Sequence, residues 1–209
     1  DGRWDSDMSG ISVSLRADGS VVAIGAYQSD GTSIYTSYTG QVRVYENNSG
    51  TWQQIGADIY GGEQYDYLGS SVSLSADGSI VAIGGHGRNS GSGHVRVYEN
   101  NSGTWQQIGT NIDGEAAQDY SGSSVSLSAD GSTVAIGAYR NDGYGNDAGH
   151  VRVYENNSGT WQQIGADIDG EAPYDGSGDF VSLTADGSVV AIGARHNDGY
   201  TGEYKSIGH

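Results

Sequence analysis

The sequence contains no cysteine and only one proline among its 209 residues. A chain without cysteine can form no disulfide, no thiolate zinc site and no cysteine nucleophile. It also has no apolar run near the roughly 18 residues that a membrane-spanning helix requires. Alanine-rich amphipathic stretches, which are typical of helical bundles, are absent too. These absences exclude several broad classes of protein before any motif is considered.

Basic residues are scarce as well, since 9 Lys and Arg stand against 26 Asp and Glu, for a net charge of −17. A surface this acidic repels phosphate backbones and anionic lipids and attracts cations. We therefore expect no nucleic-acid partner and no membrane insertion. Glycine is abundant, with 36 residues. Because glycine does not recur at every third position, the composition excludes collagen and indicates many tight turns.

The strongest signal is an internal repeat. The segment SVSLRADGSVVAIGAY returns three times in close variants, and its valines Val13, Val72, Val125 and Val181 are spaced 59, 53 and 56 residues apart. A second segment, VRVYENNSGTWQQIG, is identical where it begins at Val42, Val95 and Val151. We therefore expect a single repeat domain over 1–209, with units at 1–59, 60–112 and 113–168 and an incomplete unit at 169–209. The array is either a ring of four units or a section of a longer one.

Each unit predicts four short strands. Val13 and Leu15 alternate with serines, as in a strand with two unlike faces, and Asp18-Gly19 is a tight-turn signal. In the first unit we expect strands at residues 12–15, 21–25, 42–45 and 51–55. Four antiparallel strands repeated at this period are typical of propeller blades. The predicted fold is an all-β propeller of four-stranded antiparallel blades, about four in number, with the last one incomplete.

A lone four-stranded sheet cannot bury both of its apolar faces, so neighbouring blades must cover them. In the first unit we expect this cover for Val22, Ile24, Val44 and Trp52. The second unit carries Val81, Ile83, Val97 and Trp105 at these positions, and the third carries Val134, Ile136, Val153 and Trp161.

The run AIGAYRNDGYGNDAGHVRVYENNSGTWQQIGADIDGEAPYDGSG resembles the FG-GAP repeats of bacterial and algal surface proteins, distant relatives of integrin α-subunit blades. The resemblance extends over essentially the whole chain. It implies a non-enzymatic extracellular or cell-surface module for adhesion or structural assembly, which displays variable loops on a rigid propeller. The alternative is a lectin-like module that binds carbohydrate with the help of calcium. Partners would be a protein or glycan at the cell surface, or further copies joined through the incomplete fourth unit.

Acidic runs are the first candidate for a calcium site. Calcium takes six to eight oxygen ligands, and an Asp-x-Asp-Gly-Glu run places several carboxylates around one turn. The candidate ligands are Asp167, Asp169, Glu171 and Asp175, with Asn111, Asp113, Glu115 and Asp119 as their counterparts. The first unit keeps only Asp58, Glu63 and Asp66. Alternatively, these are turn-forming residues, and Asp119 and Asp175 cap their loops by bonding backbone amides.

The resemblance implies a second calcium site, in the loop between the second and third strands. Related blades carry a D-x-[DN]-x-D-G-x-x-D pattern there, which Asn141, Asp142 and Asp147 match in part. Asn197, Asp198 and Asp30 match it less well, and the second unit lacks the carboxylates. His94 and His150 share one repeat position that other units fill with Gln41 or Glu203, so we do not expect them to form a metal site.

Tyrosines gather in or beside the variable loops. Tyr27, Tyr139, Tyr144 and Tyr200 are the candidate ligand-binding residues, with Tyr35 and Tyr38 near them. Tyrosine offers flat contact area at low entropic cost, which suits glycan or protein recognition, although ordinary loop packing would explain it too. Asn47, Asn100 and Asn156 each begin an Asn-Asn-Ser glycosylation sequon. The same residues are also good turn formers.

Overall fold

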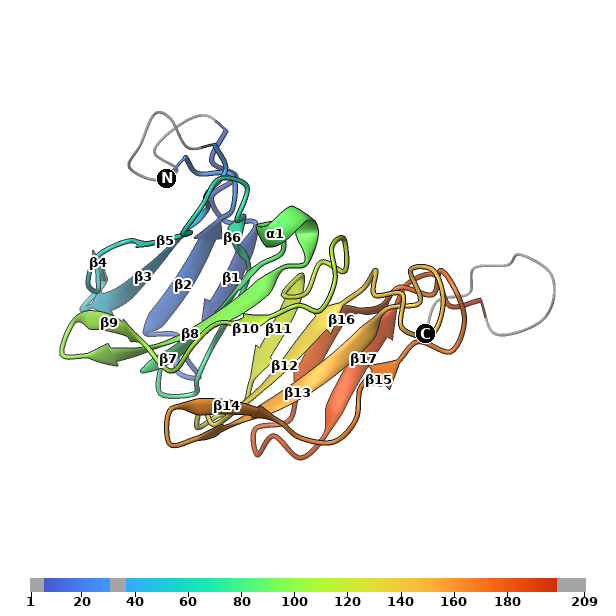
Figure 1. Cartoon of the computed structure of the whole chain (residues 1–209). Coiled ribbons are helices and arrows are strands. Elements are labelled where there is room, and N and C mark those ends of the chain that lie inside the picture. The colour runs from blue at the N-terminus through green and yellow to red at the C-terminus, as the bar shows by residue number, and fades with distance from the viewer. Residues whose placement is uncertain (1–5, 31–36, 199–209) are drawn as a thin grey trace.

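A computed structural model describes residues 6–30 and 37–198, and in these ranges the chain forms one short helix, α1(Arg88–Gly91), and seventeen strands. Four antiparallel sheets follow one another along the chain (Figure 1). The first contains β1(Ser12–Leu15), β2(Val21–Ala26), β3(Gln41–Asn48), β4(Thr51–Gln54) and β5(Ile59–Tyr60). The second contains β6(Leu68–Leu74), β7(Ile80–Gly85), β8(His94–Asn101), β9(Thr104–Gln107) and β10(Ile112–Asp113). The third contains β11(Ser124–Leu127), β12(Thr133–Ala138), β13(His150–Asn157), β14(Thr160–Gln163) and β15(Ile168–Asp169), and the fourth contains β16(Ser177–Leu183) and β17(Val190–Ala194).

The predicted blade is confirmed in the first three units. Their strands pair in chain order as an antiparallel meander, with Val13 opposite Ile24 and Ala23 opposite Val44 in the first blade. The sequence did not predict the fifth strand of each blade. Residues 59–60 return to the start of β3, so that β3 pairs with β4 along one half and with β5 along the other. The described part of the fourth blade contains two strands.

Successive blades are joined through the serines of their first strands. Ser12 Oγ donates to the carbonyl of Gly69 (2.7 Å), and Ser71 does the same to Gly122 (2.8 Å). The alternation of serine with valine or leucine in this strand is therefore explained by two different neighbours. The serines face the following blade, while the apolar residues face the preceding one.

Glycine in the second strand allows the blades to approach this closely. A Cβ atom added at Gly84 would lie 2.0 Å from the carbonyl oxygen of Gly122, and one added at Gly137 would lie 2.0 Å from that of Gly178. Because no real side chain tolerates such a distance, the glycine that follows isoleucine in β2, β7 and β12 is a packing requirement of the stack.

The apolar core lies between blades. One cluster joins Val44 of the first blade to Val81 and Ile83 of the second, and another joins the second blade to the third. The indole Nε1–H of Trp105 donates to the Ile55 carbonyl (3.0 Å), and that of Trp161 donates to the Ile108 carbonyl (3.0 Å).

In the first unit, the expected burial of apolar residues by neighbouring blades is incomplete. Val22 and Ile24 are only half-buried, and Trp52 is 46 % exposed. Among the described residues no sheet precedes the first blade, so nothing there corresponds to the Ile55 carbonyl that receives Trp105.

Candidate binding rim

One rim of the stack is built from residues that flank the inner strands. Tyr27, His86, Tyr139 and Arg195 directly follow the second strands β2, β7, β12 and β17. Tyr67 directly precedes the inner strand β6, and Tyr120 stands at the equivalent position of the third unit. Since consecutive blades lie side by side, residues that follow a second strand alternate along this rim with Tyr67 and Tyr120, which precede the first strands of the second and third blades.

These side chains form a continuous ladder of rings, which we call the aromatic rim. Ring centroids are 5.7 Å apart for Tyr27 and Tyr67, 5.3 Å for Tyr67 and His86, and 5.8 Å for His86 and Tyr120. Tyr120 and Tyr139 then stack at 5.8 Å with an interplanar angle of 15°. Tyr38 and Tyr65 extend the ladder from Tyr67, at 5.9 Å and 6.3 Å. Separations of this size are those of favourable aromatic pairs.

Two guanidinium groups complete the rim at the third and fourth blades. Arg140 lies 5.2 Å from the ring centroid of Tyr120 and 5.6 Å from that of Tyr139, and Arg195 also lies 5.6 Å from Tyr139. All three distances are within the range of cation–π attraction. A cavity of about 520 Å³ opens beside them, lined in part by Tyr139, Arg140, Pro173, Tyr174, Arg195 and His196. Asp147, Asp175 and Asp198 contribute carboxylates to its wall.

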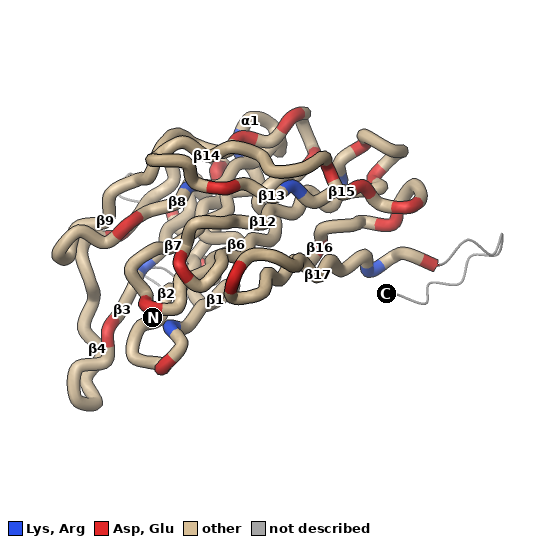
Figure 2. Tube along the Cα trace, turned by 90° about the horizontal axis from the view of Figure 1, so that it is seen from below, with Lys and Arg blue, Asp and Glu red and all other residues tan. Residues whose placement is uncertain are grey.

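His86 and Tyr67, in the middle of the rim, are uncharged near neutral pH. Burial lowers the pKa of His86, and burial together with the neighbouring tyrosines raises the pKa of Tyr67. The rim therefore presents aromatic rings along the first three blades and guanidinium groups at the far end. This contrasts with the acidic residues distributed along the loops elsewhere (Figure 2).

The sequence anticipated part of this arrangement. Tyr27 and Tyr139 are members of the ladder, and Tyr38 lies beside it, whereas Tyr144 is an exposed residue of the following loop. Tyr200 and Tyr35 lie outside the described residues. The sequence did not indicate Tyr67, Tyr120, His86 or the two arginines. Their repeat positions, close to the ends of the inner strands, could have identified them, whereas their residue types could not.

The acidic runs do not converge on one point. Asp167 accepts two hydrogen bonds from Arg152 (2.9 and 2.7 Å), which lowers the pKa of its carboxyl group. Asp113 pairs with Arg88 (3.3 Å), and Asn111 accepts a hydrogen bond from Arg96 (3.3 Å). Asp58 pairs with Arg43 (3.3 Å) and Glu63 with Arg88 (2.8 Å). Asp169 and Glu171 are exposed.

The last carboxylate of each run caps its own loop. Asp66 accepts a hydrogen bond from the Gly62 amide (2.7 Å), Asp119 from Ala116 (3.1 Å) and Asp175 from Ala172 (2.8 Å). All three are buried. This is the loop-capping role that the sequence left open beside calcium binding.

One cluster combines three groups that could bind a metal, Glu115, His150 and Asp167, whose ligand atoms lie within 4.8 Å of one another. His150 Nδ1 is 3.6 Å from Asp167, and burial lowers the pKa of the imidazole. However, the Arg152 guanidinium bonds both Glu115 and Asp167 and places a positive charge between them. As arranged, this cluster does not fit a calcium ion.

The loop site remains a prediction. Asn141 Oδ1 accepts a hydrogen bond from the Gly143 amide, and Asp142 Oδ1 accepts one from the Asp147 amide, both at 2.8 Å. Asn197 donates to Asp175 (3.3 Å), and Asp30 accepts from the Tyr38 amide (2.9 Å). Oxygen atoms of these loops are thus partly occupied by backbone donors.

The three sequon asparagines lie in hairpin turns. Asn47, Asn100 and Asn156 each accept a hydrogen bond from the glycine amide three residues later, at 2.7, 2.7 and 2.8 Å. The turn-forming role is therefore visible, and glycosylation stays a prediction.

No helix among the described residues is long and apolar enough to cross a bilayer. Residues 110–154 match the FG-GAP repeat family. No curated protein is significantly similar to the chain in sequence.

Solved structures share the fold at low sequence identity. A putative 6-phosphogluconolactonase from Bacteroides uniformis aligns with a TM-score of 0.60 and 14% identity, over 88% of this chain and 47% of its own. The hydrazine synthase of Kuenenia stuttgartiensis gives 0.59 and 12%, over 95% and 45%. TolB from Acinetobacter baumannii gives 0.51 and 14%, over 90% and 38%. The chain spans less than half the length of each, and these likenesses concern the fold alone.

Proposed function

From the premise that this chain is an FG-GAP repeat protein with a propeller-type fold, we propose that it is a non-enzymatic module at the cell surface or outside the cell, which attaches to a partner through the aromatic rim. The observation that carries the proposal is the ring ladder from Tyr27 to Tyr139, which runs across three blades. The rings of this ladder are half-buried. Aromatic surface that is left partly open to solvent is typical of interaction sites.

The repeated architecture supports a display role. Three blades share an identical outer hairpin, VRVYENNSGTWQQIG, while the residues at the rim differ from blade to blade. A rigid scaffold with variable loops is how binding residues are commonly presented. Near-identical units also favour a scaffold over a reaction centre, because a reaction centre would be built at one place.

The cavity beside Tyr139 favours a second candidate, carbohydrate binding. An aromatic face next to Arg140 and Arg195 offers stacking for a sugar ring and charge-assisted hydrogen bonds for its substituents. In this candidate, calcium in the loop of Asn141, Asp142 and Asp147 would hold the wall of the cavity in place.

The test is binding of the purified chain to immobilised glycans and to surfaces coated with extracellular-matrix protein, each with calcium and with a chelator. The proposal expects binding that Tyr139→Ala weakens and that Trp52→Ala, an exposed aromatic residue away from the rim, leaves unchanged. Binding to glycan that is lost with the chelator favours the second candidate. Equal loss in both variants, or no binding to any of these surfaces, contradicts a recognition role for the rim.

A further inference from the structure

Every blade has two unlike faces. The leading face, toward the preceding blade, carries the apolar residues of the first two strands, which in the second blade are Val72, Leu74, Val81 and Ile83. The trailing face, toward the following blade, carries serines and small residues of the first two strands, which in the second blade are Ser71, Ser73, Ala82 and Gly84, together with Val95 and Val97 of the third strand. Each internal interface joins one trailing face to one leading face.

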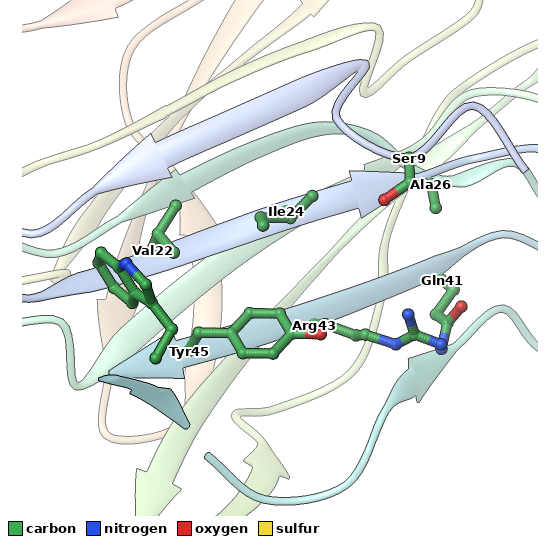
Figure 3. Close-up of a pocket in the computed structure, with 8 residues that line it drawn as sticks. Ser9, Val22, Ile24, Ala26, Gln41, Arg43 and Tyr45 are labelled. Atoms are coloured by element: carbon green, nitrogen blue, oxygen red, sulfur yellow. The ribbon is translucent and has the colours of Figure 1, made fainter. Parts of the chain in front are cut away.

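The leading face of the first blade is open. Leu15 is 60 % exposed, whereas Leu74, at the same repeat position, is 8 % exposed beneath the first blade. Val22 and Ile24 on β2 and Tyr45 on β3 lie on one side of the sheet (Figure 3). Together with Trp52 they line a groove of about 290 Å³. This face has the composition of a covered leading face.

The trailing face of the fourth blade is open in the same way. Val189 is 59 % exposed, whereas its first-blade counterpart Val21 is 4 % exposed beneath the second blade. Phe180 is 69 % exposed, and it occupies the position from which Ser12 and Ser71 reach the following blade. The two ends of the described stack therefore present the two halves of one interface.

Two kinds of hydrogen bond recur from one internal interface to the next. The Leu74 amide donates to Ser14 Oγ (2.9 Å), and the Leu183 amide donates to Ser126 Oγ (2.9 Å). The Ala76 amide donates to the Ala129 carbonyl, and the Ala129 amide to the Ala185 carbonyl, both at 2.8 Å.

The repeat positions identify the groups at the two ends that would form the same two hydrogen bonds with another copy. They are Ser182 Oγ and the Ala185 amide on the trailing face, and the Leu15 amide and the Ala17 carbonyl on the leading face.

We propose that a second copy of this chain docks head to tail, with its first blade seated on the fourth blade of its neighbour. The contact continues the internal interface, so its register is already defined by three intrachain examples. Within the described part of the fourth blade, which contains the first two strands, Phe180 departs from the pattern. In place of the serine, its phenyl ring would pack on Ile11 and Val13 of the incoming copy, which are exposed apolar residues. Unlike-face contacts of this kind close into rings or extend as filaments. This proposal does not depend on what the aromatic rim binds.

The test measures the mass of the purified chain in solution by light scattering after size-exclusion chromatography. Docking predicts species of at least twice the 21.7 kDa of one copy. Leu15→Asp on the leading face and Phe180→Asp on the trailing face should each give single copies. Because both side chains are exposed, the urea midpoint of each variant should stay near that of a single wild-type copy.

A mixture of the two variants provides the sharper readout. Each variant retains one intact face, so an equimolar mixture should form a pair that neither variant forms alone. A wild-type chain that remains a single copy at hundreds of micromolar would overturn the proposal. It would also be overturned if the mixture failed to pair, or if both variants associated as well as the wild type.

Discussion

The backbone conformation of the rim residues shows which residue types the fold requires at these positions. Met8, Tyr67, Tyr120 and Gly176 occupy one repeat position, and all four have a left-handed backbone, with φ between 54° and 67°. Glycine meets that requirement without strain, whereas a residue with a Cβ atom pays roughly 1–2 kcal/mol. The backbone conformation therefore does not require tyrosine at this position. Two tyrosines at a costly position point to a role for the rings themselves.

Replacing Tyr120 by glycine tests this argument. Relief of the left-handed strain should offset the lost ring contacts, which are worth about 0.5–1.5 kcal/mol per pair. We expect the free energy of unfolding, measured with urea, to change by less than about 2 kcal/mol while binding through the rim weakens. A variant that unfolds, or one that binds like the wild type, would show that Tyr120 is a structural residue.

His94 is the buried histidine with the largest change in acidity. It is fully buried, with Nε2 3.2 Å from the buried carboxylate of Asp66. Burial, together with the nearby Arg96 and Arg88, lowers its pKa to about 3. The first blade carries Gln41 at this position, so a neutral side chain satisfies the fold.

This depressed pKa predicts a loss of stability in mild acid. Below pH 6.5 the unfolded chain takes up a proton at His94, whereas the folded chain does not until about pH 3. Stability should therefore fall as the pH drops from 6.5, by about 2 kcal/mol at pH 5 from this residue. His94→Gln should show a shallower fall in urea unfolding between pH 7 and pH 5. An equally steep fall in the variant would refute this assignment.

At the scale of single strands, the repeat predicts most of what the structure contains. Alternation in 12–15 and the apolar run from Val21 identify the inner pair, because in the second and third blades each face of the equivalent strands meets a neighbouring blade. The short strand β5 could not be predicted. Two residues, Ile59 and Tyr60, carry no periodicity, and their strand exists only because the start of β3 lies within reach.

The close approach of blades gives a prediction with a matched control. Gly84→Ala would place a methyl group 2.0 Å from the Gly122 carbonyl and force the second and third blades apart. We expect a loss of about 1–3 kcal/mol in unfolding free energy, the usual cost of overpacking. Gly193→Ala occupies the same repeat position in the fourth blade, where the nearest atom would be Phe180 Cβ at 3.4 Å. Denaturant unfolding should show little change for it, and similar losses in both variants would contradict the stacking.

For the molecule as a whole, the sequence predicted the array of blades but not which charged residues form ion pairs. The acidic runs suggested calcium because nothing in their spacing shows that Arg152 of β13 and Arg88 of α1 reach them. Likewise, Tyr139 was visible as a loop tyrosine, while its neighbour Tyr120 comes from a different loop. Both partnerships are set by how blades stack, and a single sequence does not display them.

Calcium binding in the third blade gives a prediction for the intact chain. If the loop of Asn141, Asp142 and Asp147 takes the ion, millimolar calcium should raise the melting temperature, because a ligand bound only by the folded state stabilises it. Asp142→Asn should reduce the increase, whereas Asp169→Asn, which alters the neighbouring acidic run, should not. An equal rise in melting temperature in both variants would place the ion elsewhere. No rise with calcium in the wild type would contradict calcium binding by this chain.

The most direct test of the central claim is hydrogen–deuterium exchange of the chain, free and bound to the surface or glycan that the binding screen selects. The account predicts slower exchange upon binding in peptides that cover 65–67, 118–120 and 139–140, the segments of the aromatic rim. It also predicts unchanged exchange in the outer strands β9 and β14. Protection of the outer strands with an unchanged rim would show that the partner binds elsewhere.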